Sequence, residues 1–151
     1  MPQSLANILI HLIFSTKGRE PFLRDDGIRD ELKRYLSKCF STLESPSLIV
    51  NGTENHIHSL FSLSRNMAVK TVVGDIKSDS SKWIKKLHPS LRRFAWQRGY
   101  GAFSVSPSNK EKVRTYILNQ QQHHARMTYQ EEFRRICAYY GVAINERYVW
   151  D

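Results

Sequence analysis

The sequence predicts an α+β fold, namely a ferredoxin-like (split βαβ) antiparallel sheet with helices packed on it, followed by two C-terminal helices. Two observations lead to this class. Apolar patterns follow one another in the order strand, helix, strand, strand, helix, strand, and two helical patterns come after them. The first six elements match the split βαβ arrangement. Asn51-Gly52, a hairpin signal, separates the second and third strand patterns, so these strands are expected to be antiparallel neighbours.

The first strand and the first helix have clear boundaries. Residues 5–15 form an apolar, β-branched run that predicts a strand. Asp25 and Asp26 open a helix, because acidic side chains favour its first turn. Pro46 ends this helix, whose apolar residues follow helical spacing: Ile28, Leu32, Tyr35, Leu36, Cys39 and Leu43.

Two short strands and a second helix come next. Residues 47–50 and 56–63 are strand-like runs on either side of Asn51-Gly52. Residues 67–87 are predicted to be helical, either as one helix or as two that meet near Gly74. This segment carries much of the basic charge of the chain.

The last strand and the C-terminal helices complete the pattern. Residues 94–106 predict a fourth strand with Gly99 and Gly101 inside it, and glycines in a strand indicate a bulge or a close backbone approach. Ser108 and Glu111 match a capping box for a helix that runs to about residue 123. A last helix is expected over residues 128–140, where Gly141 ends it.

The composition fits one domain over residues 1–151, with 40% hydrophobic and 11% aromatic residues. A membrane span needs about 18 apolar residues, and the best candidate, residues 5–14, is shorter and contains Asn7 and His11. No signal peptide is recognised. The two cysteines, Cys39 and Cys137, make neither a disulfide framework nor a zinc motif. We therefore expect a cytoplasmic, nucleoid-associated protein with reduced cysteines and no membrane partner.

Basic charge is concentrated in the middle of the chain. Over residues 65–114, twelve Lys and Arg stand against three acidic residues, which accounts for the whole formal net charge of +9. A solvated, salt-bridged helix face would need more acids nearby, so a surface for a polyanion is the better interpretation. Candidate DNA contacts within it are Lys82, Lys85, Lys86 and Arg98. Charge alone does not separate DNA, RNA and acidic lipid.

A His-x-His pair is the first candidate for chemistry. His56 and His58 leave the same face of a predicted strand and can hold one metal ion. A shuffled chain with this histidine content contains about 0.2 such pairs, so for the pair taken alone two half-buried strand histidines are the better explanation. A histidine-triad hydrolase would need a third histidine at Leu60, and a two-histidine phosphoesterase would need two His-x-Ser/Thr motifs. The sequence has neither.

One tyrosine stands out as a candidate nucleophile. A tyrosine that attacks DNA keeps the energy of the broken bond in a phosphate ester, and its phenol, with a pKa of about 10, needs help from a metal ion. Among seven tyrosines only Tyr116 has a possible ligand four residues later, Gln120, and on a helix the two share a face. Val113 and Ile117 extend the same face, so a packed core aromatic stays open as an alternative.

Several segments together resemble the single-tyrosine HUH-superfamily insertion-sequence transposases and their domesticated repeat-associated relatives. His56-Ile57-His58 resembles the HUH motif, and residues 116–120 resemble the helix of the catalytic tyrosine. Residues 11–17, 96–104 and 130–133 are also similar to the family, in the same order. The resemblance covers nearly the whole chain and is specific because separate motifs agree.

The resemblance implies a transposase that cleaves and rejoins single-stranded DNA at hairpin-marked element ends through a 5′-phosphotyrosine intermediate. By matching position, Tyr116 is the nucleophile, and His56, His58 and Gln120 are metal ligands. Nitrogen and amide oxygen donors suit Mg²⁺ or Mn²⁺. The resemblance also implies a homodimer, and in many members the tyrosine helix serves the partner's histidines. The sequence leaves docking in cis or in trans open. Ser59 departs from the family's usual aliphatic residue, which puts local packing in doubt.

Other residues allow less specific interpretations. His11, among apolar strand residues, is expected to lie in the core or to support a metal ligand, with a ligand role of its own as the alternative. His123 and His124 follow Gln120 by one helical turn and are candidates for contact with DNA or with a leaving group. Trp96 and Tyr100, near Arg98, are available for stacking on bases or for packing in the core. The alternative function is a non-catalytic single-stranded nucleic-acid-binding module of ferredoxin-like fold, which would not need the histidines, the tyrosine and the glutamine together.

Overall fold

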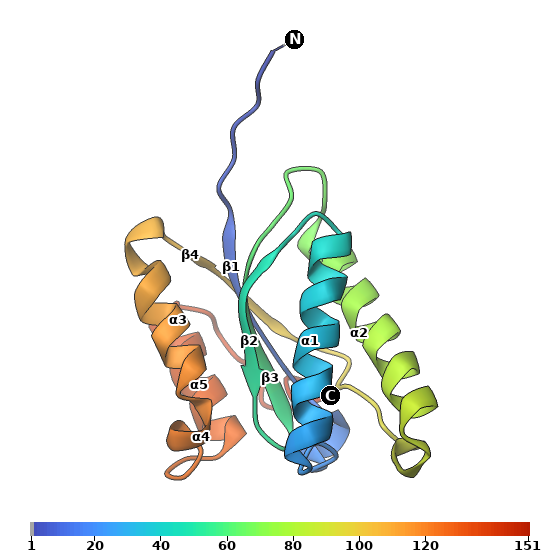
Figure 1. Ribbon diagram of the computed structural model, residues 1–151. Helices are drawn as coiled ribbons and strands as arrows, with labels where there is room; N and C mark the ends of the chain where they lie inside the picture. Colours follow the sequence, from blue (N-terminus) through green and yellow to red (C-terminus); the bar gives the residue numbers. More distant parts are fainter. Residues whose placement is uncertain (1) are drawn as a thin grey trace.

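The computed structural model describes residues 2–151 and confirms the predicted fold class (Figure 1). In this part of the chain, four strands form one antiparallel sheet in the order β2-β3-β1-β4. They are β1 (Leu9–Ser15), β2 (Ser47–Gly52), β3 (His56–Ser62) and β4 (Gly101–Val105). β3 lies between β1 and β2, which is the split βαβ arrangement.

One face of the sheet is covered by α1 (Asp26–Thr42) and α2 (Val69–Leu87) (Figure 1). As predicted, Asp25 caps α1, because its carboxylate accepts a hydrogen bond from the backbone of Ile28 at 3.0 Å. α2 is one helix that continues through Gly74. Alternate residues of β1 enter the main hydrophobic core with these helices: Ile10, Leu12 and Phe14.

The other face carries α3 (Lys110–Leu118), α4 (Gln120–His123) and α5 (Tyr129–Tyr139) (Figure 1). Leu9 packs with Ile117 of α3, and Ile13 packs with Phe133 of α5. Both faces of the sheet are therefore covered, and every residue of β1 is buried. This explains the nearly continuous apolar run of the first strand. Within residues 2–151, three short 3-10 turns connect the larger elements: Lys17–Arg19, Pro89–Leu91 and Pro107–Asn109.

The β2–β3 hairpin exists, but its turn is not at Asn51-Gly52. Both residues belong to β2, where Asn51 faces His58 across the sheet, and the turn consists of residues 53–55. Gly52 is needed because a Cβ atom there would collide with the carbonyl oxygen of His56. The Asn51 side chain has another use. Its Nδ2 donates to the carbonyl oxygens of Ile117 at 2.8 Å and of Leu118 at 3.1 Å, and thereby caps the end of α3.

The first and the last strand of the chain are shorter than predicted. β1 begins at Leu9 because both of its partners end there, Ser62 in β3 and Val105 in β4. The predicted strand over residues 94–106 is reduced to β4, and Gly99 lies outside it. Gly101 does mark a close approach, because a Cβ atom would lie 2.7 Å from the ring of Phe133.

The predicted helix up to residue 123 is broken into α3 and α4 at Asn119, whose φ of −95° and ψ of 23° are not helical. Ser108 does not cap α3, because it belongs to the turn before the helix and its hydroxyl contacts that of Ser106 at 3.0 Å. The capping box occurs at α5 instead, between Thr128 and Glu131. Gly141 follows α5 with φ of 70°, as predicted for its C-terminus. None of the helices within residues 2–151 is both long and apolar enough to span a membrane.

Candidate active site and metal centre

The two histidines of β3 lie on the sheet face that α3, α4 and α5 cover. His56 and His58 are both fully buried, with no exposed surface. The alternation of the strand sends both rings to one side, and Ile57 between them enters the opposite core. Regular pairing with β1 fixes the strand, since Ser15 faces His56 and Ile13 faces His58. The imidazoles are therefore held by a rigid central strand.

Gln120 and Tyr116 approach these histidines from above the sheet. Gln120 is fully buried, and its Oε1 lies 3.3 Å from Nε2 of His56. The hydroxyl of Tyr116 donates a hydrogen bond to Oε2 of Glu132, and the Tyr116 ring centre lies 6.0 Å from that of His58. The four residues singled out in the sequence thus converge within a single chain. The break at Asn119 does not separate Gln120 from Tyr116, because α4 continues beside the same sheet face.

Glu132 is the residue that sequence reasoning missed. Its carboxylate, 1% exposed, lies in the centre of the site. Oε1 lies 2.9 Å from Nε2 of His58 and 3.6 Å from Nε2 of His56, while Oε2 accepts from Tyr116 and from Nε2 of Gln120 at 3.3 Å. A signal was present in the sequence, because Glu132 occupies a core-face position of α5 beside Tyr129 and Phe133. An acid at such a position has to be paired.

His124 and His123 take different places after α4. Nε2 of His124 lies 2.9 Å from Oε1 of Glu132, so this ring joins the site. His123 stacks on the ring of Tyr116 at 4.4 Å between centres, and its buried Nε2 has no hydrogen-bond partner in the part of the chain described. The first histidine thus packs on the candidate nucleophile, and the second reaches the candidate metal ligands.

Hydrogen bonds behind the rings orient both strand histidines. Nδ1 of His56 donates to Oδ1 of Asn55 at 2.8 Å and lies 2.9 Å from Oγ1 of Thr53. Nδ1 of His58 lies 2.9 Å from Nε2 of His11, which is therefore a supporting residue. In both rings Nδ1 is occupied, and Nε2 points into the site. This is how proteins orient imidazoles that bind metal ions.

Burial sets the charges of the site. It lowers the pKa of His56 to about 4, with the neighbouring carboxylate of Glu132 opposing the shift, and it lowers the pKa of His11 to about 3, helped by His58. Burial alone would raise the pKa of Glu132, but His58, His124 and His56 outweigh it and hold this pKa below its usual range. At neutral pH the site therefore holds neutral His11 and His56 around an ionised carboxylate.

The phenol of Tyr116 has a raised pKa, first because of burial and then because of the negative charge of Glu132. It is therefore protonated at neutral pH, and its attack on a phosphate requires the loss of its proton, which a nearby cation favours. The donor set fits a divalent cation. One ligand atom from each of four residues lies within 4.8 Å of the others: His56, His58, His124 and Glu132.

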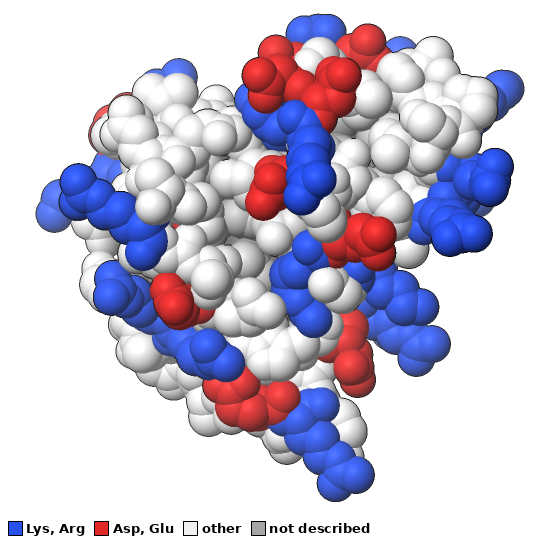
Figure 2. Space-filling model, turned by 90° about the horizontal axis from the view of Figure 1, so that it is seen from below, with Lys and Arg blue, Asp and Glu red and all other residues white. Residues whose placement is uncertain are grey.

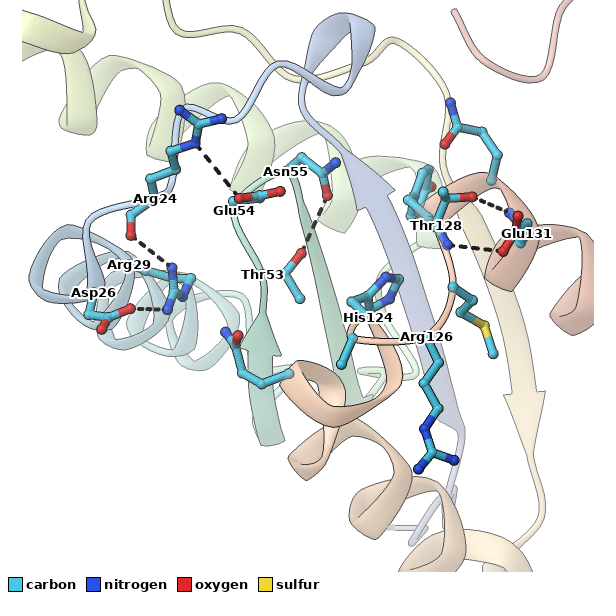
Figure 3. A pocket seen from close by; sticks show the side chains of 15 residues that line it. Arg24, Asp26, Arg29, Thr53, Glu54, Asn55, His124, Arg126, Thr128 and Glu131 are labelled. Atoms are coloured by element: carbon cyan, nitrogen blue, oxygen red, sulfur yellow. Dashed lines mark hydrogen bonds and ion pairs between the residues drawn. The ribbon is translucent and has the colours of Figure 1, made fainter.

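Two hollows approach this cluster from different sides. A polar hollow of about 730 Å³ lies between the start of α1, the β2–β3 turn and the segment after α4, and His124 lies on its wall (Figure 3). In Figure 3 Thr53 and Asn55 line it close to His124. A second hollow of about 420 Å³, mostly apolar, lies between α3 and α5, and its wall includes Tyr116, Glu132 and His11. The candidate nucleophile is thus reached from the second hollow.

The predicted DNA contacts do not lie at this site. Lys82, Lys85 and Lys86 belong to α2, on the opposite face of the sheet (Figure 1). Arg98 is exposed in the segment before β4. Lys77 of α2 is used internally, because its Nζ donates to the backbone carbonyls of residues 97, 98 and 99 at 2.6, 3.2 and 3.1 Å. Figure 2 shows Lys and Arg around much of the rim at the end of the molecule where α4 lies, with acidic groups among them.

Known proteins share this sequence pattern and this fold. The family described as "Transposase IS200 like" matches residues 4–120. Among solved structures, a candidate transposase from Deinococcus radiodurans has a TM-score of 0.65 and 22% identity, covering 80% of this chain and 95% of that chain. A REP-associated tyrosine transposase bound to a REP hairpin has a TM-score of 0.52 and 13% identity, covering 78% and 66%. None of the curated protein sequences matches. His124 and Glu132 lie beyond the residues that the family matches.

Proposed function

The chain belongs to the IS200-like transposase family, and on this premise we propose that it cuts and rejoins single-stranded DNA with Tyr116 as nucleophile. The observation that carries this proposal is the convergence of one tyrosine hydroxyl, two buried histidines and a glutamine in one chain. A module that only binds nucleic acid has no use for a buried carboxylate that joins a tyrosine to histidines.

The proposed reaction is a reversible phosphoryl transfer. The phenol oxygen of Tyr116 attacks the scissile phosphorus, the bond from phosphorus to O3′ breaks, and a 5′-phosphotyrosine and a 3′-hydroxyl result. The phenol proton is exchanged through water for the proton of the new hydroxyl. Rejoining is the reverse attack by a 3′-hydroxyl on the phosphotyrosine, so no external energy source is needed.

Buried residues have separate tasks in this scheme. His56, His58 and Gln120 are the proposed metal ligands, and Mg²⁺ or Mn²⁺ held by them would polarise the phosphate and balance its charge. Asn55, Thr53 and His11 hold the imidazoles with Nε2 towards the site. Glu132 and the stacked ring of His123 fix the direction of the Tyr116 hydroxyl. The apolar hollow between α3 and α5 gives the DNA strand access to this hydroxyl.

The proposed substrate is single-stranded DNA marked by a hairpin, and the proposed assembly is a homodimer. Support for a hairpin comes from the structural neighbour that is bound to a REP hairpin. The basic charge of α2 and Arg98 supports a second contact with phosphates. Because α2 lies across the sheet from Tyr116, we propose that it binds the hairpin stem rather than the scissile phosphate.

The test is a covalent adduct with a single-stranded oligonucleotide that carries a hairpin and a label 3′ of the cleavage site. Hairpins from the DNA that flanks the gene are the first substrates to try. The wild-type chain should retain the label in a denaturing gel when Mn²⁺ is present. Tyr116→Phe should lower adduct formation at least about a thousandfold while hairpin binding in a gel shift is retained, because only one oxygen is lost. Tyr129→Phe is the matched control, since this buried tyrosine also has a raised pKa and lies beside His56. An adduct formed by the Tyr116→Phe variant would contradict the assignment.

A further inference from the structure

We propose that Glu132 and His124 bind the metal ion together with His56, His58 and Gln120, so that three imidazoles and one carboxylate join the amide oxygen at the centre. The inference deepens the proposed function and rests on it, because it names further ligands for the same ion. Both residues lie after residue 120, where the family match ends. They come from α5 and from the end of α4, whereas the two other histidines come from β3.

The spacing of the donor atoms fits one ion. A divalent transition metal lies about 2.1 Å from its ligands, so neighbouring donors are about 3 Å apart and opposite donors a little more than 4 Å apart. Oε1 of Glu132 lies 2.9 Å from Nε2 of His58, 2.9 Å from Nε2 of His124 and 3.6 Å from Nε2 of His56. All four donor atoms lie within 4.8 Å of one another. Shifts of a few tenths of an ångström therefore accommodate the ion.

The positions of the protons on the histidine rings also favour a cation in the site. The proton of His56 is used on Nδ1, which donates to Oδ1 of Asn55. Its Nε2 lone pair then faces two oxygens, Oε1 of Gln120 at 3.3 Å and Oε1 of Glu132 at 3.6 Å. Three acceptors that face one another in a buried space repel each other unless a positive charge lies between them. With an ion there, Nδ1 of His58 carries its proton and donates to His11.

The second carboxylate oxygen gives this ligand a further role. While Oε1 faces the three imidazoles, Oε2 accepts the hydrogen bond from the hydroxyl of Tyr116. The same carboxylate therefore ties the position of the nucleophile to that of the ion. Gln120 contributes to this arrangement, because its Nε2 donates to Oε2 of Glu132 at 3.3 Å. Glu132 is thus a metal ligand and a positioning residue for Tyr116.

The composition of the centre determines which ion it prefers. Imidazole donors suit Mn²⁺ and later transition metals better than Mg²⁺, which favours oxygen ligands and water. His56, His58 and Gln120 are neutral ligands, so the Glu132 carboxylate supplies the negative charge that attracts the cation. We expect the DNA-free protein to bind Mn²⁺ at least tenfold more tightly than Mg²⁺.

The experiment is a titration of the DNA-free protein with Mn²⁺, in which the unbound ion is measured by electron paramagnetic resonance. Glu132→Gln and His124→Gln should each weaken Mn²⁺ binding tenfold or more. Glu131→Gln and His88→Gln are matched controls: the first keeps the capping box, and the second removes a histidine that pairs with Glu31 away from the site. Both should bind Mn²⁺ as the wild type does.

If the Glu132→Gln variant bound Mn²⁺ as tightly as the wild type while the His56→Ala variant did not bind it, the inference would be overturned. The proposed metal site would then still stand. Pulsed resonance of the Mn²⁺-loaded wild type keeps the test independent of variant folding. A spectrum with three imidazole nitrogens bound to Mn²⁺ supports the inference. A spectrum with only two shows that His124 is not a ligand. The adduct assay reports separately on the proposed function, because it detects strand cleavage and not metal binding.

Discussion

The hydroxyl of Tyr116 and the carboxylate of Glu132 are joined by a hydrogen bond, although one residue belongs to α3 and the other to α5. The carboxylate touches His58 with its other oxygen at 2.9 Å. The candidate nucleophile is therefore one side chain away from the histidines of its own subunit. This relationship bears on how subunits of a dimer would share the site.

We expect each subunit to carry a complete site. A chain with Tyr116→Phe and a chain with both His56→Ala and His58→Ala should each be inactive, and the mixed dimer should stay inactive. The reason is that Tyr116 contacts Glu132 of the same chain and Asn51 holds the end of α3. The measurement is strand cleavage by mixtures whose heterodimers are isolated through two affinity tags. Recovery of about half of the wild-type cleavage would show instead that the tyrosine serves the partner's histidines.

Acid should begin to destabilise the metal-free protein at a pH well above the ordinary pKa of a carboxyl group. Burial lowers the pKa of His11 to about 3 and of His56 to about 4, from an ordinary value of 6.5. Between these pH values the unfolded chain binds more protons than the folded one. The contribution of the two neutral histidines to the free energy of unfolding is therefore fully present above pH 6.5 and is lost as the pH falls towards their folded pKa values. At pH 5 each histidine accounts for a loss of about 2 kcal/mol.

This loss is measured by urea unfolding at pH 7 and pH 5 in the presence of a chelator. His11→Gln should reduce the difference in unfolding free energy between the two pH values, because glutamine can still accept from His58 but does not titrate. An unaltered difference in His11→Gln would mean that His11 does not titrate as its burial requires.

Charge reversal on α2 should weaken binding without regard to sequence. Lys82, Lys85 and Lys86 changed together to Glu should lower the affinity for hairpin and non-hairpin DNA alike, and flatten the salt dependence of binding. The control is the same charge reversal on α1, at Lys33, Arg34 and Lys38. It changes the net charge equally, so it distinguishes a direct contact of α2 with DNA from a general effect of net charge. Equal effects of the two triple variants, measured by fluorescence anisotropy at several salt concentrations, would remove α2 from the DNA interface.

Two glycines should respond in opposite ways to alanine. Gly52→Ala forces a Cβ atom against the carbonyl oxygen of His56 and should lower the free energy of unfolding by about 2 kcal/mol or more. Gly74→Ala lies in α2, where, apart from its chain neighbours and the nearby backbone of its own helix, no described atom is within 4 Å of the added carbon. It should raise stability by about 0.5–1 kcal/mol. Denaturant unfolding of both variants checks this, and a neutral Gly52→Ala would show that the hairpin adjusts easily.

Local patterns were enough to predict the order of the elements and the place of the strand histidines. Alternation in β3 puts His56 and His58 on one face whatever covers that face, and Asp25 caps α1 through contacts within one turn. Features that depend on distant parts of the chain were missed. The helix break at Asn119 coincides with a cap from Asn51, which is 66 residues away from Ile117 along the chain.

Glu132 illustrates the same limit in the site. Its position on the buried side of α5 is visible in the sequence, but its partners come from β3, α3 and α4. No spacing rule relates these segments. The turn of the hairpin was misplaced for a related reason, because Asn51-Gly52 has the composition of a turn while Gly52 is required by a close approach inside a strand.

The side chain of Asn51 has a mechanical consequence. This residue pairs with His58 in the sheet and holds the last carbonyls of α3 with two hydrogen bonds. A force that pulls the tyrosine helix away is therefore transmitted directly to the strand of the histidines. Any exchange of α3 between two subunits has to break this anchor first, so exchange should be slow and should be accelerated by shortening Asn51 to alanine.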